Sequence, residues 1–161
     1  MRFTFLLPIA LIAGAAVAAP VRDDQLKPVS VQMAAAGQAA LAAGKPQDAI
    51  DSFEAALASD PRNVAAFSGI AAAYEKQGLP GKAVKYYREA LALNPSDLLA
   101  LEGQGRALVA RGATARAQIN LARIKALCKT ECSGAARLEG VIAKASAQAS
   151  VAPVKAKIQQ D

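Results

Sequence analysis

Two cysteines, Cys128 and Cys132, are the side chains in this sequence best suited to covalent chemistry. Three residues, KTE, separate them, whereas thiol oxidoreductases use two intervening residues beside a βαβ unit, a pattern that this sequence lacks. A structural zinc site needs four ligands, and there is no histidine to complete one. The missing histidine is also the commonest general base. We therefore expect no metal, no cofactor and no enzymatic activity.

The first 18 residues have the pattern of a secretory signal peptide. Arg2 precedes the apolar stretch FLLPIALIAGAAV, and residues 16–18 (AVA) form the small-x-small motif that signal peptidase cleaves. We expect cleavage after Ala18, because a cut one residue later would place Pro20 directly after the scissile bond. The alternative is a retained membrane anchor, for which the apolar run is short against the roughly 20 residues that span a bilayer.

A cleaved leader predicts a periplasmic protein of a Gram-negative bacterium with no integral membrane span. In an oxidising compartment, the even number of cysteines predicts a disulfide between Cys128 and Cys132. Loop-entropy reasoning assigns such a short ring only about 2 kcal/mol of stabilisation. The bridge would therefore secure a local junction rather than hold the fold together.

Most of the sequence repeats with a period of 34 residues. Glycine recurs at positions 44, 78 and 112, and alanine recurs at positions 49, 83 and 117. A bulky residue follows each alanine by four positions, and a proline closes the first two copies. These residues are Phe53, Tyr87 and Leu121, with Pro61 and Pro95. The third copy is weaker, since Lys129 takes the place of the proline.

Each copy contains two apolar-striped segments of about 14 residues joined at the glycine, which predicts a helix–turn–helix unit. The alanines let paired helices approach closely, and the bulky residues fill the space between them. Pro46 and Pro80 stand where a helix can start with proline, and Pro61 and Pro95 stand where the second helix must end. The fold class is therefore predicted to be all-α.

These recurring residues resemble the signature of the tetratricopeptide repeat family. The best copy is residues 64–97, and in the first copy Ala40 replaces the usual aromatic residue. The matching residues of the best copy are Ala71, Tyr74, Gly78, Ala83, Tyr87, Ala90 and Pro95. The resemblance implies an α-solenoid of three units, at residues 30–63, 64–97 and 98–131, of which the third is degenerate.

The flanking segments complete this domain plan. A terminal repeat needs a cap over its apolar flank, and residues 132–146 provide a helical stripe for it. The stripe consists of Ala135, Leu138, Ile142 and Ala145. We expect residues 19–29 to form a flexible arm and residues 147–161 to form a disordered tail.

The family geometry also implies a partner-binding groove along the first helix of each unit. Family members that clamp a C-terminal carboxylate use several lysine, asparagine and arginine residues there, and only Arg106 is of that type in this chain. The implied groove residues are Val31, Ala34, Gln38, Leu41, Ala65, Ser68, Ala72, Glu75, Leu99, Glu102, Arg106 and Val109.

Charge is concentrated in the C-terminal part of the chain. Residues 20–97 carry eight basic and nine acidic side chains, whereas residues 98–161 carry ten and four. The basic residues near the predicted cap are Arg106, Arg111, Arg116, Arg123, Lys125, Lys129 and Arg137. They predict either a solvated helical surface or a patch that attracts an acidic partner or an anionic membrane surface. Nucleic acid is disfavoured by export and by the few aromatic residues available for stacking.

The resemblance implies a non-catalytic adaptor or scaffold of the bacterial cell envelope that binds a peptide or partner protein in its groove. Three alternatives stay open: a self-associating structural module, a protein that binds through the basic C-terminal surface, and one that binds through the tail at 147–161.

Overall fold

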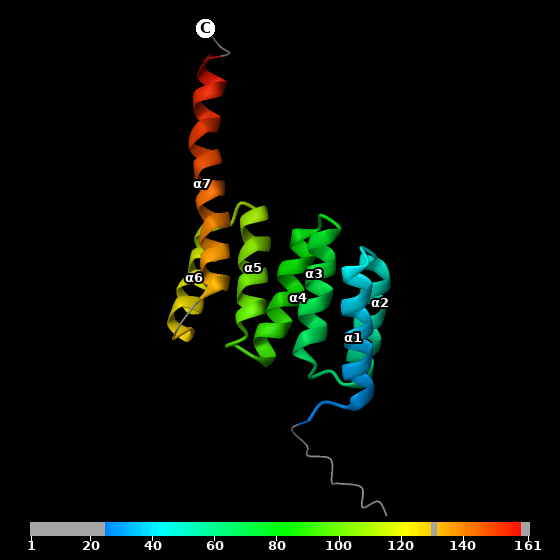
Figure 1. Cartoon of the computed structure of the whole chain (residues 1–161). Coiled ribbons are helices and arrows are strands. Elements are labelled where there is room, and N and C mark those ends of the chain that lie inside the picture. Colours follow the sequence, from blue (N-terminus) through cyan, green and yellow to red (C-terminus); the bar gives the residue numbers. More distant parts are fainter. Residues whose placement is uncertain (1–24, 130–131, 159–161) are drawn as a thin grey trace, which may run out of the picture.

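Seven helices make up the part of the chain that this computed structural model describes, residues 25–129 and 132–158 (Figure 1). No strand occurs in these two ranges, so the all-α prediction is confirmed there. The predicted signal peptide and residues 19–24 of the predicted arm lie outside the described residues. The helices are α1 (Pro28–Ala42), α2 (Pro46–Ser59), α3 (Val64–Lys76), α4 (Pro80–Leu93), α5 (Leu98–Ala110), α6 (Thr114–Leu127) and α7 (Ser133–Ile158).

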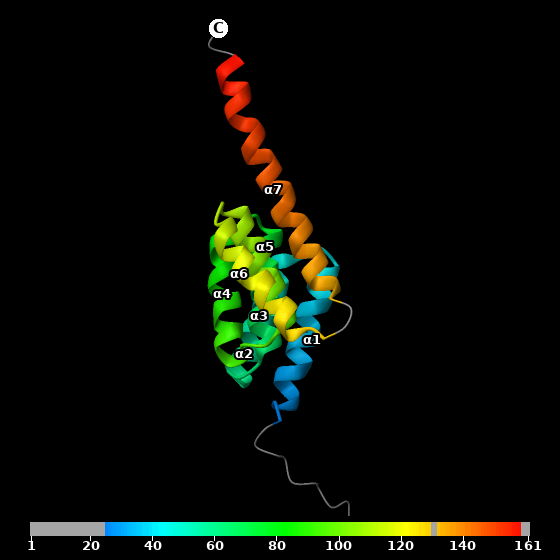
Figure 2. The same ribbon diagram turned by 90° about the vertical axis from the view of Figure 1, so that its left-hand side faces the viewer.

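The helices form antiparallel pairs that stack in chain order. α1 pairs with α2, α3 with α4 and α5 with α6, and successive pairs meet through α2 on α3 and α4 on α5. The first helices of the pairs also contact one another. α7 packs on both α5 and α6, where the first helix of a fourth pair would lie. Figure 2 shows α1 and α7 toward one side of the stack and α2 and α4 toward the other. The predicted solenoid with a capping helix is confirmed.

The turn inside each pair depends on its glycine. Gly44, Gly78 and Gly112 have φ angles of 72°, 71° and 74°. This left-handed conformation costs glycine little and strains residues that carry a Cβ atom. Pro46 and Pro80 begin the helices that follow the first two turns, as predicted.

The turn between successive pairs is built from polar caps. α2 and α4 end before Pro61 and Pro95, and the next helices are capped by the side chains of Asn63 and Asp97. Each cap accepts a hydrogen bond from a backbone N–H in the first turn, at 3.1 Å for Asn63 and 2.9 Å for Asp97. α6 lacks the proline and ends at Leu127, next to Cys128.

The core is packed by aromatic rings against glycines. Phe53 of α2 is fully buried against Gly37 of α1 and Gly69 of α3, and Tyr87 of α4 lies against Gly103 of α5. A Cβ atom at any of these three glycines would overlap the ring atoms, so the close approach of the helices requires glycine there. The capping stripe behaves as predicted, since Ala135, Leu138 and Ile142 are buried and Ala145 is half-buried.

Two boundaries correct the sequence-based expectations. α1 begins at Pro28, so residues 28–29 of the predicted arm are helical, because the fixed φ of proline suits the first position of a helix. α7 continues to Ile158, so the expectation that the cap ends at residue 146 and that a disordered tail follows is wrong for residues 147–158. Alanine, the strongest helix former, occupies four of these twelve positions and favours continuation of the helix, whereas Pro153 opposes it. Residues 159–161 lie outside the described part.

The second half of α7 projects beyond the stack (Figure 1). None of the helices within the described ranges combines the length and the apolar character needed to cross a membrane.

Candidate functional site

A cleft of about 400 Å³ opens on the side of the stack that carries the first helices of the pairs. We call it the groove. Residues from α1, α3, α5 and α7 line it, together with the cap of α5 and one residue of α4. Seven of the twelve predicted groove residues lie in its lining: Gln38, Ala65, Ser68, Ala72, Leu99, Glu102 and Arg106.

The other five predicted residues lie elsewhere. Val31 is exposed on α1, and Ala34 is buried in the core. Leu41 lines a separate depression near the first turn. Val109 packs on the core of the second and third pairs. Glu75 does not line the groove itself, but its carboxylate pairs with Arg106, which does.

Four lining residues were missed by the sequence analysis: Gly69, Tyr87, Asp97 and Arg137. Tyr87 belongs to a second helix, and it reaches the groove because Gly103 leaves room for its ring. Arg137 comes from α7. It lies 34 residues after Gly103, which was not a predicted groove residue, so the repeat period does not identify it.

The carboxylate of Glu102 is the centre of an ion-pair network at the C-terminal end of the groove. Its side chain is only 5% exposed. Arg137 donates to it in a bidentate manner, from Nε to Oε1 at 2.8 Å and from Nη2 to Oε2 at 2.7 Å. Arg106 donates from Nη1 to Oε1 at 2.9 Å. This network joins α5 to α7 through the groove wall.

A second carboxylate extends the network to α3. Arg106 donates from Nη2 to Oε2 of Glu75 at 3.1 Å, and the hydroxyl of Tyr87 donates to the same oxygen at 2.7 Å. The guanidinium of Arg106 therefore bridges two carboxylates from different helices.

The pKa shifts follow from these contacts. The hydrogen bonds from Arg137 hold the pKa of Glu102 below its ordinary value, and the charge of Arg106 acts in the same direction. Burial raises the pKa of the Tyr87 hydroxyl far above its ordinary value, and the negative charge of Glu75 adds to this effect. Glu102 is therefore ionised and Tyr87 neutral near pH 7, so the charges in the groove wall largely compensate one another.

One polar atom of the groove is left without a partner. The Oγ atom of Ser68 on α3 is buried and makes no hydrogen bond within the part of the chain that the structure describes. Buried hydroxyls are normally hydrogen-bonded, so this hydroxyl is an exception in the groove wall.

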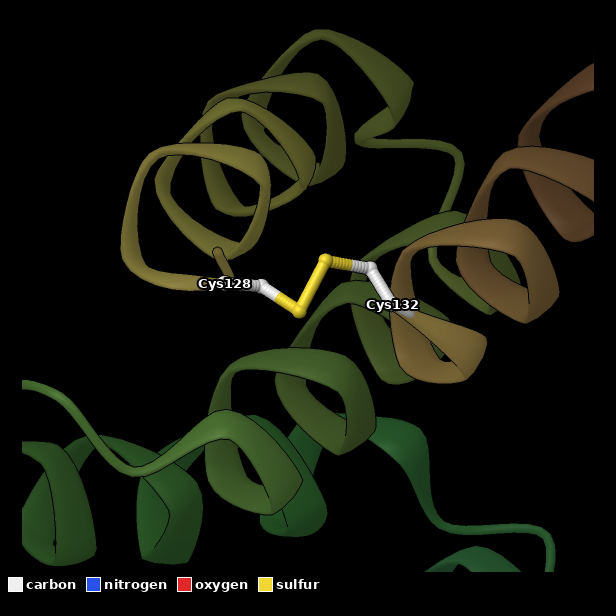
Figure 3. Close-up of a disulfide and its surroundings, with 2 residues drawn as sticks. All are labelled: Cys128 and Cys132. Carbon is white, nitrogen blue, oxygen red and sulfur yellow. A yellow bond between two sulfur atoms is a disulfide. The ribbon is translucent and has the colours of Figure 1, made fainter. Parts of the chain in front are cut away.

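The disulfide predicted from the sequence joins the end of α6 to the start of α7 (Figure 3). The Cα atoms of Cys128 and Cys132 are 5.9 Å apart, within the usual range for a disulfide. The bridge therefore ties the capping helix covalently to the third pair.

Several of the basic residues near the cap already have partners within the protein, so fewer are available to bind an acidic partner than their number indicates. Arg106 and Arg137 pair with carboxylates of the groove wall. Lys125 pairs with Glu139 at 3.1 Å, and Arg123 donates to the carbonyl of Pro95 at 2.7 Å. These contacts weaken the case for a strongly positive binding patch.

Comparison with known families identifies one match, to the tetratricopeptide repeat, at residues 34–97 and 69–123. Together these matches span more than half of the chain. No curated protein matches the sequence.

Several solved structures share the fold at low sequence identity. The Sgt2 TPR domain from Aspergillus fumigatus has a TM-score of 0.71 and 24% identity over 81% of this chain and 87% of that chain. The TPR2B domain of yeast Sti1, solved in complex with an Hsp70 peptide, has a TM-score of 0.70 and 18% identity over 76% and 99% of the two chains. The first TPR of RPAP3 (Spaghetti), bound to the HSP90 peptide SRMEEVD, has a TM-score of 0.67 and 24% identity over 74% and 96%.

Proposed function

Because the chain belongs to the tetratricopeptide repeat family, we propose that it is a non-catalytic adaptor that binds a peptide or a partner protein in the groove. The observation that carries the proposal is the groove itself, which runs across all three pairs and the capping helix. A surface of this shape suits an extended or helical segment of another protein.

The lining offers both kinds of contact that such a segment needs. Leu99 is 73% exposed at the edge of the groove, where it can contact an apolar side chain of a ligand. Ser68 contributes a hydroxyl that has no hydrogen bond within the described part of the chain, and Ala65 and Ala72 let the ligand backbone approach closely.

The ligand differs in chemistry from the acidic peptide in the RPAP3 structure. Both arginines of the groove are already paired with Glu75 and Glu102, so an added carboxylate would have to compete with them. A ligand that contributes apolar side chains and backbone hydrogen bonds fits this groove better than an acidic tail.

The location that we propose is the bacterial cell envelope. It rests on the signal-peptide pattern predicted at residues 1–18, and the disulfide fits an oxidising compartment. Expression of the full-length chain in a Gram-negative host tests it, with periplasmic protein expected to begin at Ala19. Recovery of chains that retain Met1 in the membrane fraction would contradict the cleavage.

A display experiment tests the binding. Peptides that bind the mature protein are selected from a random library. Their affinity is then measured for the wild type and for two variants, Ala65→Glu in the groove and Ala92→Glu on α4. Both alanines are exposed. We expect Ala65→Glu to lose most of the binding because it places a bulky charge in the groove, and Ala92→Glu to bind as the wild type. Equal binding by both variants would place the ligand elsewhere.

A further inference from the structure

A second hollow lies at the junction of α5, α6 and α7, next to the groove. Its volume is about 260 Å³. This is below the range of about 300 to 1,000 Å³ that is usual for small-molecule sites. The size suits one large side chain rather than a cofactor.

We propose that this hollow is a subsite of the groove that accepts a large apolar side chain of the bound peptide. The inference rests on the proposed function, because it names the kind of residue that the peptide must carry. We call the hollow the cap subsite and define it by Leu98, Leu99, Ile124, the Cys128–Cys132 disulfide and Arg137.

The lining of the cap subsite is mainly apolar. Leu98 and Leu99 come from the first turn of α5, Ile124 comes from α6, and the disulfide closes the side toward α7. Leu98 is 39% exposed and Leu99 is 73% exposed, so both present apolar surface that a ligand can cover. The corresponding residues of the second repeat are Val64 and Ala65, which are smaller. The feature is therefore specific to the third pair and its cap.

The cap subsite and the groove form one continuous surface. Leu99, Glu102 and Arg137 line both hollows. A peptide that lies along α3 and α5 therefore passes directly over the cap subsite. The single occupant that this arrangement fits is a side chain of that same peptide.

The charges of the wall favour an uncharged occupant. Among the described residues, Glu102 is the one acidic side chain in the lining of the cap subsite, and the guanidinium of Arg137 already neutralises it through two hydrogen bonds. A charged side chain placed here would lose its hydration without gaining a partner, whereas leucine, methionine or phenylalanine would gain from burial.

The test compares two leucines of matched exposure. Leu98 is 39% exposed in the cap subsite, and Leu79, at the turn before α4, is 40% exposed and lines neither hollow. The 15-residue peptides selected from the random library against the wild-type mature protein are measured against Leu98→Glu and Leu79→Glu. Circular dichroism checks that each variant is folded, and Leu98→Ala serves if Leu98→Glu does not fold.

We expect the selected peptides to share a large apolar residue at a fixed position. Changing it to alanine should weaken binding to the wild type about tenfold or more, as expected for one buried leucine-sized side chain. Leu98→Glu should cause a similar loss, and Leu79→Glu none. On Leu98→Glu the alanine peptide should bind no worse than its parent, because the contact has already been removed.

Two outcomes would overturn the inference. The first is that the peptides bind Leu98→Glu as tightly as they bind the wild type. The second is that the alanine change in the peptide weakens binding to the wild type and to Leu98→Glu by the same factor. Either result would mean that the cap subsite is not occupied, while the proposed function would stand. If the wild type selects no peptide at all, the proposed function and the inference fail together.

Discussion

The two ends of the helical stack are packed differently, although each contains a buried ion pair, Asp60 with Arg62 at the first junction and Glu102 with Arg137 at the last. At the first junction, the ring of Phe53 lies between Gly37 and Gly69, and no solvent reaches it. At the last junction, the equivalent residue is Leu121, which is only half-buried. There the capping helix is held by Leu138, by the ion pairs of Glu102 and Lys125, and by the disulfide.

The last junction shows which contacts replace the residues that the third copy of the repeat has lost. The third copy has lost the aromatic ring and the closing proline, which are the parts that shape the junctions of the other copies. The buried Leu138 of the cap, which packs against Gly105, the ion pairs of Glu102 and one covalent bond take over their role. Apolar packing responds little to salt, moderate acidity or reductant, whereas ion pairs and a disulfide respond to all three. Both junctions contain a buried ion pair and the disulfide lies at the last one, so the two ends should differ most in sensitivity to reductant.

The largest expected effect is that of emptying the first junction. Phe53→Ala removes a fully buried ring, which should cost about 3 to 5 kcal/mol of unfolding free energy. Leu121→Ala, the matched change at the last junction, should cost about 1 to 2 kcal/mol because the side chain is smaller and half-buried. Urea unfolding followed by circular dichroism measures both. Equal losses would show that the two junctions are packed alike.

Removing the covalent link should have the next largest effect. The double variant Cys128→Ser, Cys132→Ser should lose about 2 kcal/mol, as loop entropy predicts for a ring this short. Limited proteolysis should then cut first near the start of α7 and leave α1 to α4 intact. A variant that is cut first in α1 or α2 would contradict a local role for the bridge.

Weakening the buried ion pair should cost slightly less. Glu102→Gln keeps the shape of the side chain but loses its charge, and we expect a loss of about 1 to 2 kcal/mol because Arg137 loses its charged partner and Arg106 keeps only Glu75. Glu139→Gln is the control, since its pair with Lys125 is exposed and should contribute less than about 1 kcal/mol. Urea unfolding at low and high salt compares them. A larger loss of unfolding free energy for Glu139→Gln would show that the exposed pair contributes more than the buried one.

Acid should affect the same end of the molecule. The pKa of Glu102 is lowered in the folded protein, so its contribution is complete above the ordinary pKa of glutamate and is lost as the pH falls through the lowered value. The stability difference between the wild type and Glu102→Gln should therefore shrink on acidification. Unfolding curves across the acid range measure it, and a difference that stays constant would mean that the charge of Glu102 does not stabilise the fold.

Much of the fold could be predicted because the residues that shape the turns and the helix packing recur in the three copies of the repeat. The glycines at 44, 78 and 112 fix the turns, and Phe53 and Tyr87 fix the spacing of the helices. The groove could be predicted only in part. Tyr87 reaches it from a second helix through space that a glycine leaves, and Arg137 reaches it from the cap. Such contacts depend on packing between elements, which the period of the sequence does not describe.

Hydrogen exchange with and without reductant, at low and high salt, is the sharpest test of whether ion pairs and a disulfide add to the apolar packing that holds the capping helix. We expect the amides of residues 133–142 to lose protection in reductant, and to lose more when high salt is added, whereas those of α1 to α4 keep their protection in reductant. Equal loss of protection along the whole chain, or none in α7, would contradict this expectation.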